Sequence, residues 1–437
     1  MRKLLAVGSA VAILAVVALK SGALNFLALD GNTGDDAVGA VIIHYGLFCL
    51  GIAFVTARRS QGAAVALAVG TLLAVVCLEV LLRVFTLLPE RTLPKEQWLR
   101  SRKYHHVALS NEKMFAGYVS GEPIIVSTNE DGLRSQYSRS DYLRYSRRIT
   151  ILGDSFTFGF RVAEENSLPH KLENILRDSL RSDDVAVLNA GLTSHSPRTE
   201  IQVYEGKVRA YRPNVVVLCL DATDFGDDIT YSREAATLGD SCFVTADELP
   251  HRPLPSSVLR LALPLLTYPL DLIKSHFFPD SEFTSPKTKY YQFGLDIDGV
   301  HETNRFFIYR HPLKSTLSYF ESTLHNINTI AEYVRRDSSR FVLILLPRFQ
   351  HWSTRECLHN WEGSMYNVEE PFQFEYLKFF DAKKDSLPYP VFNLLPAFQA
   401  TDEFPLVFDT DPHLNERGNA FVAKALAHYL IEKKLVP

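Results

Sequence analysis

The pattern of hydrophobic positions divides the chain near Pro89. Before this point, long apolar runs contain few charges, and about 20 consecutive apolar residues are enough to cross a bilayer as a helix. We therefore predict an all-α transmembrane anchor over residues 1–89, with hydrophobic segments at about 4–29, 37–57 and 63–88. The first segment is short and follows Arg2 and Lys3, so a cleaved signal peptide is the alternative interpretation there.

Basic residues beside these segments predict which side of the membrane the rest of the chain occupies. Arg2 and Lys3 precede the first segment, and Arg58 and Arg59 lie between the second and the third. Short loops rich in Lys and Arg stay on the cytoplasmic side. We therefore expect a multi-pass protein of the cytoplasmic (inner) membrane whose remaining residues lie on the outer, periplasmic side.

Beyond a polar linker at 90–120, short apolar runs alternate with amphipathic stretches. Four runs are typical of strands buried on both faces, at 148–152, 185–188, 215–220 and 341–346. Helices are expected near 169–180, 198–210, 316–336 and 416–434. This alternation predicts an α/β domain over 121–437, with a parallel sheet covered on both faces and an insertion at about 225–312.

Composition narrows the classes of partner. The 437 residues have a formal net charge of -4, and residues 1–89 are slightly basic, so the rest of the chain is acidic. An acidic domain has no basic field for a phosphate backbone, and nucleic acid is not an expected partner. His105, His106 and His170 have no partners at metal-ligand spacing, so no metal or other cofactor is assigned.

Small polar clusters follow three of the predicted strands, and one more precedes the last helix. They are Gly153-Asp154-Ser155, Asn189-Ala190-Gly191, Asp221-Ala222-Thr223-Asp224 and Asp411-Pro412-His413. Ligands of doubly wound sheets bind outside the carboxyl ends of the strands. We therefore expect the four clusters to share one rim of the sheet.

Acyl transfer requires the kinds of group that these clusters supply. A serine hydroxyl needs a base to accept its proton, the base needs an orienting carboxylate, and the developing oxyanion needs hydrogen-bond donors. Ser155 is the candidate nucleophile, with His413 as the base and Asp411 as the residue that orients it. The candidate oxyanion donors are the amides of Ser155 and Gly191 and the hydroxyl of Thr223.

Simpler roles compete with these assignments. Gly-Asp-Ser also occurs by chance, Ser after a strand is a common helix cap, and a capping or loop histidine is the competing interpretation of His413. Thr157 replaces the last Gly of a Gly-x-Ser-x-Gly elbow, and the run does not fit a P-loop. Acidic residues near the rim are expected to cap the sheet or to lie in polar loops: Asp154, Asp221, Asp224, Asp227 and Asp228.

From about Gly121 to the C-terminus, the chain resembles the SGNH (GDSL-like) hydrolases and acyltransferases. The resemblance rests on the lead-in Asn129–Arg134, the Gly-Asp-Ser-Phe-Thr-x-Gly block, the Asn-Ala-Gly block and the Asp-x-His-x-Asn-x-x-Gly ending. It implies a flavodoxin-like three-layer α/β/α sandwich with a parallel five-stranded sheet. It also implies the roles already named, with Ser155 and Gly191 as oxyanion donors.

Two departures from the family pattern bear on the mechanism. Thr223 stands where the family usually has the Asn of Gly-x-Asn-Asp, so a hydroxyl would replace an amide donor. Asp411 precedes His413 by two residues rather than three. The shorter spacing resembles membrane-anchored members of the family, including relatives of the alginate O-acetyltransferases.

These observations predict a membrane-anchored serine esterase that acts through an acyl-enzyme on an acylated carbohydrate or a lipid-linked substrate of the cell envelope, beside membrane lipid. One alternative is an O-acetyltransferase of an envelope polysaccharide, in which a sugar hydroxyl replaces water. Three spans look too few to carry an acyl group across a bilayer, so a transferase would need a polytopic acyl-donor protein as partner. A second alternative is a non-catalytic scaffold that keeps the fold, which Thr223 makes conceivable.

Overall fold

Five parallel strands form the central sheet of the protein, in the order β11-β10-β7-β5-β6. They are β5 (Arg147–Gly153), β6 (Val185–Gly191), β7 (Val215–Leu220), β10 (Arg340–Leu345) and β11 (Val391–Asn393). The four apolar runs of the sequence form β5, β6, β7 and β10, and the prediction of a parallel five-stranded sheet is confirmed. The computed structural model describes residues 99–101, 103–119, 122–238, 294–360, 362, 366–367 and 371–437.

The strand order reverses direction between β5 and β7. From β5 the chain moves outward to β6, then crosses back over β5 to β7 and continues to β10 and β11. This is the flavodoxin-like order, in which the crevice beside the first strand, at the carboxyl ends, binds the ligand. The segments that follow β5 and β7 are therefore where a site is expected.

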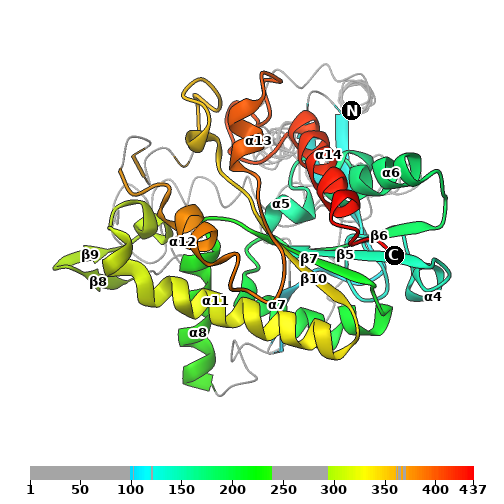
Figure 1. Cartoon of the computed structure of the whole chain (residues 1–437), viewed down its shortest axis with the longest axis horizontal. Helices are drawn as coiled ribbons and strands as arrows, with labels where there is room; N and C mark the ends of the chain where they lie inside the picture. The colour runs from blue at the N-terminus through cyan, green and yellow to red at the C-terminus, as the bar shows by residue number, and fades with distance from the viewer. Residues whose placement is uncertain are drawn as a thin grey trace, which may run out of the picture. The chain divides into compact units, whose positions relative to one another are not determined.

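Helices cover the two faces of the sheet (Figure 1). On one face lie α6 (Leu168–Leu180), α13 (Leu395–Ala400) and α14 (Glu416–Glu432). On the other lie α7 (Pro197–Gly206), α8 (Asp224–Leu238), α11 (Leu313–Arg336) and α12 (Glu375–Lys383). The three-layer arrangement agrees with the sequence prediction.

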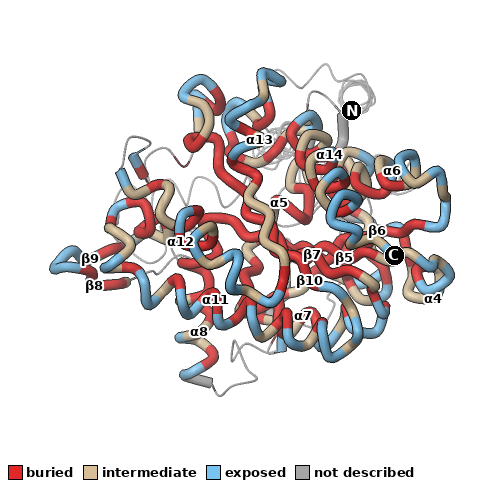
Figure 2. Tube along the Cα trace, in the orientation of Figure 1, coloured by how far each residue is buried: buried red, intermediate tan, exposed pale blue. Residues whose placement is uncertain are grey.

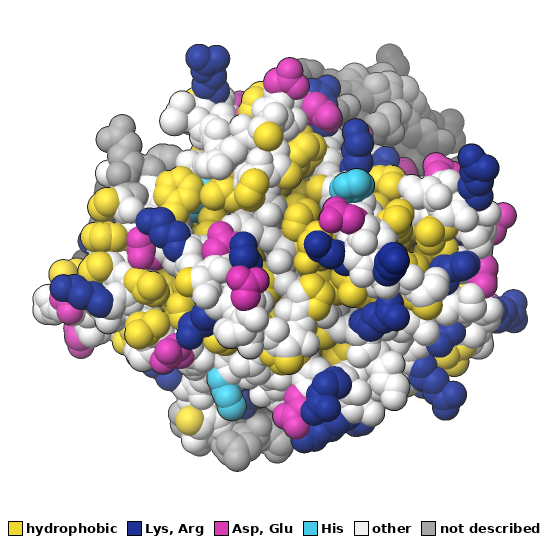
Figure 3. All heavy atoms as spheres, in the orientation of Figure 1, with side chains coloured by type: hydrophobic (Ala, Val, Ile, Leu, Met, Phe, Trp, Pro, Cys, Tyr) yellow, Lys and Arg dark blue, Asp and Glu magenta, His cyan; other side chains and the backbone are white. Residues whose placement is uncertain are grey.

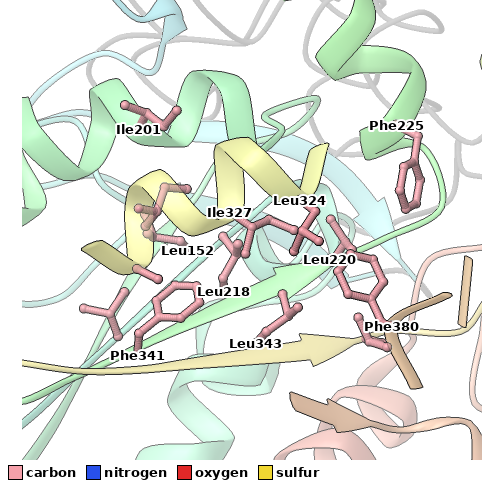
Figure 4. Close-up of a cluster of buried hydrophobic side chains, with 14 of the residues drawn as sticks. Leu152, Ile201, Leu218, Leu220, Phe225, Leu324, Ile327, Phe341, Leu343 and Phe380 are labelled. Atoms are coloured by element: carbon pink, nitrogen blue, oxygen red, sulfur yellow. The ribbon is translucent and has the colours of Figure 1, made fainter. Parts of the chain in front are cut away.

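Alternation along the central strands explains the two cores. In β7, Val215 and Val217 pack with α6 and α14, whereas Val216 and Leu218 pack with α7 and α11. All four side chains are buried, and Figure 2 shows β7 and β10 buried along most of their length. In the second core, Leu218 lies with Ile327 from α11 (Figure 4). Burying each such side chain contributes about 1.5–3 kcal/mol, so both faces of the sheet are firmly held.

The predicted linker at 90–120 and the predicted insertion at 225–312 both contain regular secondary structure. The stretch predicted as a linker includes β1 (Leu99–Ser101), paired antiparallel with β2 (His105–Val107). The expected insertion begins inside α8, whose Phe225 is fully buried, and later contributes β8 (Leu295–Ile297), β9 (Val300–Glu302) and the 3-10 helix η4 (Arg305–Tyr309). Residues 239–293 of this stretch lie outside the described residues.

The chain divides into two compact units. One comprises residues 1–95, 113–125 and 250–289, and its described residues belong to the two-stranded sheet of β3 (Lys113–Val119) and β4 (Glu122–Ser127). The other comprises residues 96–112, 126–249 and 290–437 and holds the five-stranded sheet. The predicted transmembrane segments at 4–29, 37–57 and 63–88 lie outside the described residues. Within the described ranges, no helix has the length and apolarity that a membrane span needs.

Candidate active site

Three predicted catalytic side chains meet at the carboxyl edge of the sheet. The Nε2 atom of His413 lies 2.7 Å from the Oγ atom of Ser155. The other ring nitrogen, Nδ1, is hydrogen-bonded to Oδ1 of Asp411. Ser155 begins the one-turn helix α5 (Ser155–Phe158) after β5, and the other two residues lie in the loop before α14. The structure therefore brings together a hydroxyl, an imidazole and a carboxylate in the arrangement of a serine triad.

The local sequence explains why Ser155 stands at the start of a tight turn. Gly153 ends β5 with a φ of 154°, and a Cβ atom there would lie 2.2 Å from Oγ1 of Thr157. Asp154 then caps α5, because its Oδ1 accepts a hydrogen bond from the amide of Phe156 at 2.9 Å. Gly159, with a φ of 81°, ends the helix in the left-handed conformation that favours glycine.

Arg134 fixes the other end of α5. Its Nη1 donates to the carbonyls of Phe158 at 2.8 Å and Gly159 at 2.6 Å, and its Nη2 donates to the carbonyl of Val162 at 2.7 Å. Burial lowers the pKa of Arg134 to about 10, which still leaves it charged at neutral pH. A cation near a helix C-terminus stabilises the helix, and Arg134 does so by donating hydrogen bonds to backbone carbonyls.

The spacing of two residues between Asp411 and His413 forms a compact turn. Oδ1 of Asp411 accepts a hydrogen bond from the backbone amide of His413 at 3.0 Å as well as from its ring. The ring of His413 is also held by two aromatic neighbours, Phe156 and Phe160, each with its centroid 4.8 Å away. The main chain, the carboxylate and the two rings together fix the orientation of the imidazole.

Electrostatics prepares His413 for proton transfer. Burial disfavours its charged form, but the carboxylate of Asp411 outweighs burial and raises the pKa of His413 above its usual value. Burial likewise disfavours charge on Asp411, yet His413 and Arg161 lower the pKa of Asp411 well below its usual range. Nη1 of Arg161 lies 3.7 Å from Oδ2 of Asp411. Asp411 therefore stays ionised while His413 gains and releases a proton.

The predicted oxyanion donors lie at this edge of the sheet with partners of their own. The amide of Gly191, at the end of β6, donates to Oδ1 of Asn189 at 3.0 Å. A Cβ atom at Gly191 would lie 2.5 Å from the backbone nitrogen of Phe158, so this glycine lets α5 pack on β6. Thr223, after β7, is buried, and its amide donates to Oδ1 of Asp221 at 3.2 Å. Oxyanion donation by Gly191 would require its amide to change acceptor.

The acidic residues near the rim cap backbone amides, as the sequence predicts: Asp154 accepts from Phe156, Asp221 from Thr223 and Asp224 from Asp221. Asp154, Asp221 and Asp224 are all buried. Burial, followed by the nearby charge of Asp221, raises the pKa of Asp154 to about 7. Burial and the neighbouring carboxylates Asp154 and Glu200 also raise the pKa of Asp224. Polar residues do lie at the rim, but here they form a cluster beneath Ser155 rather than a solvent-facing edge.

The interpretation of Asp227 and Asp228 as a polar loop is wrong, because both lie in the first half of α8 and are buried. Oδ2 of Asp227 lies 3.2 Å from Nη1 of Arg305. Asp228 accepts hydrogen bonds from Oγ of Ser196 at 2.6 Å and from Nδ2 of Asn326 at 3.0 Å. These partners replace the water that the carboxylates lose, which is how a polar sequence can form a buried helix.

Trp352 and His351, which follow β10, pack against other side chains of the domain. Trp352 packs against Phe398 at 4.3 Å between centroids, and its Nε1 donates to Glu356. His351, beside it in sequence, is buried. Trp361 lies outside the described residues. Trp352 therefore has a packing role. The surface shown in Figure 3 carries exposed hydrophobic side chains among charges of both signs.

A cluster of histidines was not evident from the sequence. Nδ1 of His105 lies 2.6 Å from Nδ1 of His106, and the rings of His106 and His195 are 4.6 Å apart. Separation of about 90 residues hides this contact from any local motif. Burial lowers the pKa of His195 to about 3, so this ring is neutral. Within the described part of the chain, no group of three or more His, Cys, Asp or Glu residues is arranged to hold a metal.

Solved structures with distant likeness to this chain include ester hydrolases. A protein described as lipolytic, of the G-D-S-L family, from Desulfitobacterium hafniense is 12% identical with a TM-score of 0.34, over 65% of this chain and 99% of that one. A variant of an acetyl-xylooligosaccharide esterase from Geobacillus is also 12% identical with a TM-score of 0.34, and the match covers 65% of this chain and 94% of that one. An acetyl xylan esterase is 13% identical with a TM-score of 0.33, over 64% and 99%. No protein-family model and no curated protein matches the sequence. Likenesses this distant assign no function, and the geometry of Ser155, His413 and Asp411 has to carry that conclusion.

Proposed function

We propose that this protein is a serine esterase that cleaves ester-linked acyl groups through an acyl-enzyme intermediate. The observation that carries the proposal is the position of His413, with Nε2 2.7 Å from Oγ of Ser155 and Nδ1 bonded to Asp411. A general base must lie within hydrogen-bond reach of the proton that it accepts, and this distance meets that requirement.

In the first half of the reaction, Oγ of Ser155 attacks the ester carbonyl carbon while its proton passes to Nε2 of His413. The carbonyl π electrons move to oxygen and form a tetrahedral oxyanion, and Asp411 stabilises the imidazolium. His413 then gives the proton to the leaving alcohol oxygen as the carbon–oxygen bond breaks. Water repeats the sequence on the acyl-enzyme, so that an acid is released and Ser155 regains its proton.

Stabilisation of the oxyanion is the second requirement. Preorganised donors at this position typically contribute a factor of about 10²–10³ each to kcat. The amide of Ser155 and the hydroxyl of Thr223 are the donors in this proposal, with Gly191 as a third whose amide would have to leave Asn189. A threonine hydroxyl donates one hydrogen bond, which is enough for this role, although the asparagine amide in the family pattern has two N–H donors.

Location gives the proposal its substrate class. The apolar runs within residues 1–89 support a membrane anchor, and the charges beside them support a periplasmic orientation of the catalytic domain. An enzyme held there would meet acylated glycans or lipid-linked substrates of the envelope. If a sugar hydroxyl takes the place of water, the same acyl-enzyme would make the protein an O-acetyltransferase that receives acyl groups from a polytopic partner.

The test uses a fluorophosphonate probe on the detergent-solubilised full chain. We expect wild type and the S140A control, in which an exposed serine is lost, to be labelled, and S155A to remain unlabelled. A well-folded wild-type protein that does not react would favour the non-catalytic scaffold instead. Turnover of p-nitrophenyl acetate with and without an oligosaccharide then separates hydrolysis from transfer, since only transfer places acetyl groups on the sugar.

Orientation has its own test. A C-terminal fusion to alkaline phosphatase is active only on the periplasmic side, and we expect activity. An inactive fusion of normal abundance would contradict the periplasmic orientation without affecting the proposed chemistry.

A further inference from the structure

Arg348 is a buried cation beneath the candidate active site. It follows β10, and only 2% of it is exposed. Its Nε lies 3.0 Å from both carboxylate oxygens of Asp221, and its Nη1 is paired with Oε2 of Glu362. Both carboxylates are themselves buried. Burial lowers the pKa of Arg348 by itself, but Asp221 and Glu362 raise it well above its usual value, so the guanidinium stays charged.

The carboxylate of Asp221 joins Arg348 to the predicted oxyanion residue. Oδ1 of Asp221 accepts the amide of Thr223 at 3.2 Å in addition to Nε of Arg348 at 3.0 Å. The amide of Asp221 donates in turn to Oδ2 of Asp224 at 2.7 Å. The turn from Asp221 to Asp224 is therefore closed by its own carboxylates, and Arg348 is the cation that holds one of them.

Arg348 also contacts Phe156, which packs against the catalytic base His413. Its guanidinium carbon lies 5.5 Å from the centroid of the Phe156 ring. Phe156 follows the nucleophile in sequence, and its ring lies 4.8 Å from that of His413. Arg348 therefore touches the Asp221 turn and the α5 helix at the same time, and these two elements carry Thr223 and Ser155.

We propose that Arg348, held between Asp221 and Glu362, is a positioning residue that fixes the Thr223 turn relative to Ser155 so that the turn can stabilise the oxyanion. This inference rests on the proposed esterase function. Arg348 acts through its neighbours, because it is buried and has no exposed face for substrate. Its planar guanidinium donates to Asp221 through Nε and to Glu362 through Nη1, and a lysine ammonium cannot hold two carboxylates in the same fixed directions.

A purely stabilising role is the competing explanation. Replacing buried ion pairs by apolar groups is often neutral for stability, so burial of charge is weak support for stability alone. The two explanations differ in what they predict for kcat. Stability alone predicts normal kcat per folded molecule in a conservative variant, whereas positioning predicts a loss of kcat.

The first experiment compares R348K with wild type in the full-length protein at a temperature where both are folded. Lysine keeps the charge that Asp221 and Glu362 require. We expect kcat for p-nitrophenyl acetate to fall at least about tenfold with KM nearly unchanged, because oxyanion donors act in the transition state. R177K is the matched control, since Arg177 also binds a buried carboxylate, Glu173 at 3.1 Å, on α6. Its kcat should stay within about twofold of wild type, as expected for a surface-side change.

The second experiment is a double-mutant cycle with T223V, which removes the hydroxyl at nearly constant shape. If Arg348 acts through Thr223, T223V alone lowers kcat, and adding R348K to T223V causes little further loss. Equal losses from R348K in both backgrounds would overturn the proposal, as would a normal kcat in R348K or in T223V. Fluorophosphonate labelling of Ser155 in wild type tests the esterase function separately. Labelled wild type with a normal kcat in R348K would refute the role of Arg348 alone, whereas unlabelled wild type would refute the esterase function.

Discussion

Nε2 of His413 lies 2.7 Å from Oγ of Ser155, although 258 residues separate them in the chain. The contact exists because β5 delivers Ser155 to the carboxyl edge of the sheet and the loop before α14 returns to the same edge. Asp411 completes it from within that loop.

Removing the charge of Asp411 should disable the base. In D411N the side chain can still accept the backbone amide of His413, but it no longer fixes the tautomer or stabilises the imidazolium. We expect kcat to fall by a factor on the order of 10⁴, as for the equivalent change in a serine triad. D409N is the control, because Asp409 is exposed and lies two residues away. A D411N enzyme within tenfold of wild type would contradict the assigned role.

The pH dependence of activity should follow His413. The ring must be neutral to accept the proton of Ser155, and Asp411 raises the pKa of His413 above 6.5 against the effect of burial. Activity should therefore rise with pH, with a midpoint above 6.5. Asp154 has a pKa of about 7, and once ionised it also raises the pKa of His413, so D154N should move the midpoint to lower pH. A midpoint that moves upward in D154N would show that another group controls the profile.

The free energy of unfolding should fall with rising pH through Asp154, whereas a carboxylate paired with a cation makes it rise with pH. Burial raises its pKa from 3.8 to about 7. Between these values the unfolded chain releases the proton while the folded protein keeps it, so rising pH stabilises the unfolded state. The free energy of unfolding of wild type should therefore fall relative to D154N between about pH 4 and pH 7. Urea denaturation of both proteins across this range measures the difference, and a constant difference would refute the assignment.

Sequence patterns identified the parts of the fold that depend on local burial. The runs that became β5, β6, β7 and β10 are buried on both faces and read as uninterrupted apolar segments. β11 spans only Val391–Asn393, is partly exposed, and has no periodicity to detect. Only the family resemblance predicted that the sheet has a fifth strand, and it did not say where in the chain that strand lies.

The candidate site was predictable in its reacting groups and not in its supports. Ser155, Asp411 and His413 carry recognisable chemistry at fixed positions in motifs. Arg348 belongs to no motif, and Arg134 ends the lead-in Asn129–Arg134 without its role being evident there. Both roles arise from contacts 127 and 24 residues away along the chain. Asp227 and Asp228 were misjudged for the same reason, because the residues that bind their carboxylates, Arg305, Ser196 and Asn326, lie far from them along the chain.

A side chain at Gly191 should disturb α5. The Cβ atom of G191A would lie 2.5 Å from the backbone nitrogen of Phe158 and 2.6 Å from Cβ of Thr157. Neither neighbour is the end of a flexible side chain, so the helix must shift. We expect a loss of about 1–3 kcal/mol or more in the free energy of unfolding, together with slower labelling of Ser155. In the control G294A, the new Cβ meets, among the described residues, the ring of His301 at an ordinary contact distance of 3.6 Å, and its stability should match wild type. Equal stability of G191A and G294A would disprove the close packing.

The hydrogen bonds of Arg134 should control both the stability of the domain and the reactivity of Ser155. R134M leaves the carbonyls of Phe158, Gly159 and Val162 without the donors that they now have. Hydrogen bonds to charged groups contribute about 1.5–3 kcal/mol each, so we expect the free energy of unfolding to fall by about 3 kcal/mol or more. R144M changes an arginine whose side chain is 78% exposed and should stay within about 0.5 kcal/mol of wild type. Because α5 loses its C-terminal support, the fluorophosphonate should label Ser155 more slowly in R134M even where the protein is fully folded. Normal labelling in folded R134M would mean that Arg134 stabilises the domain without positioning the nucleophile.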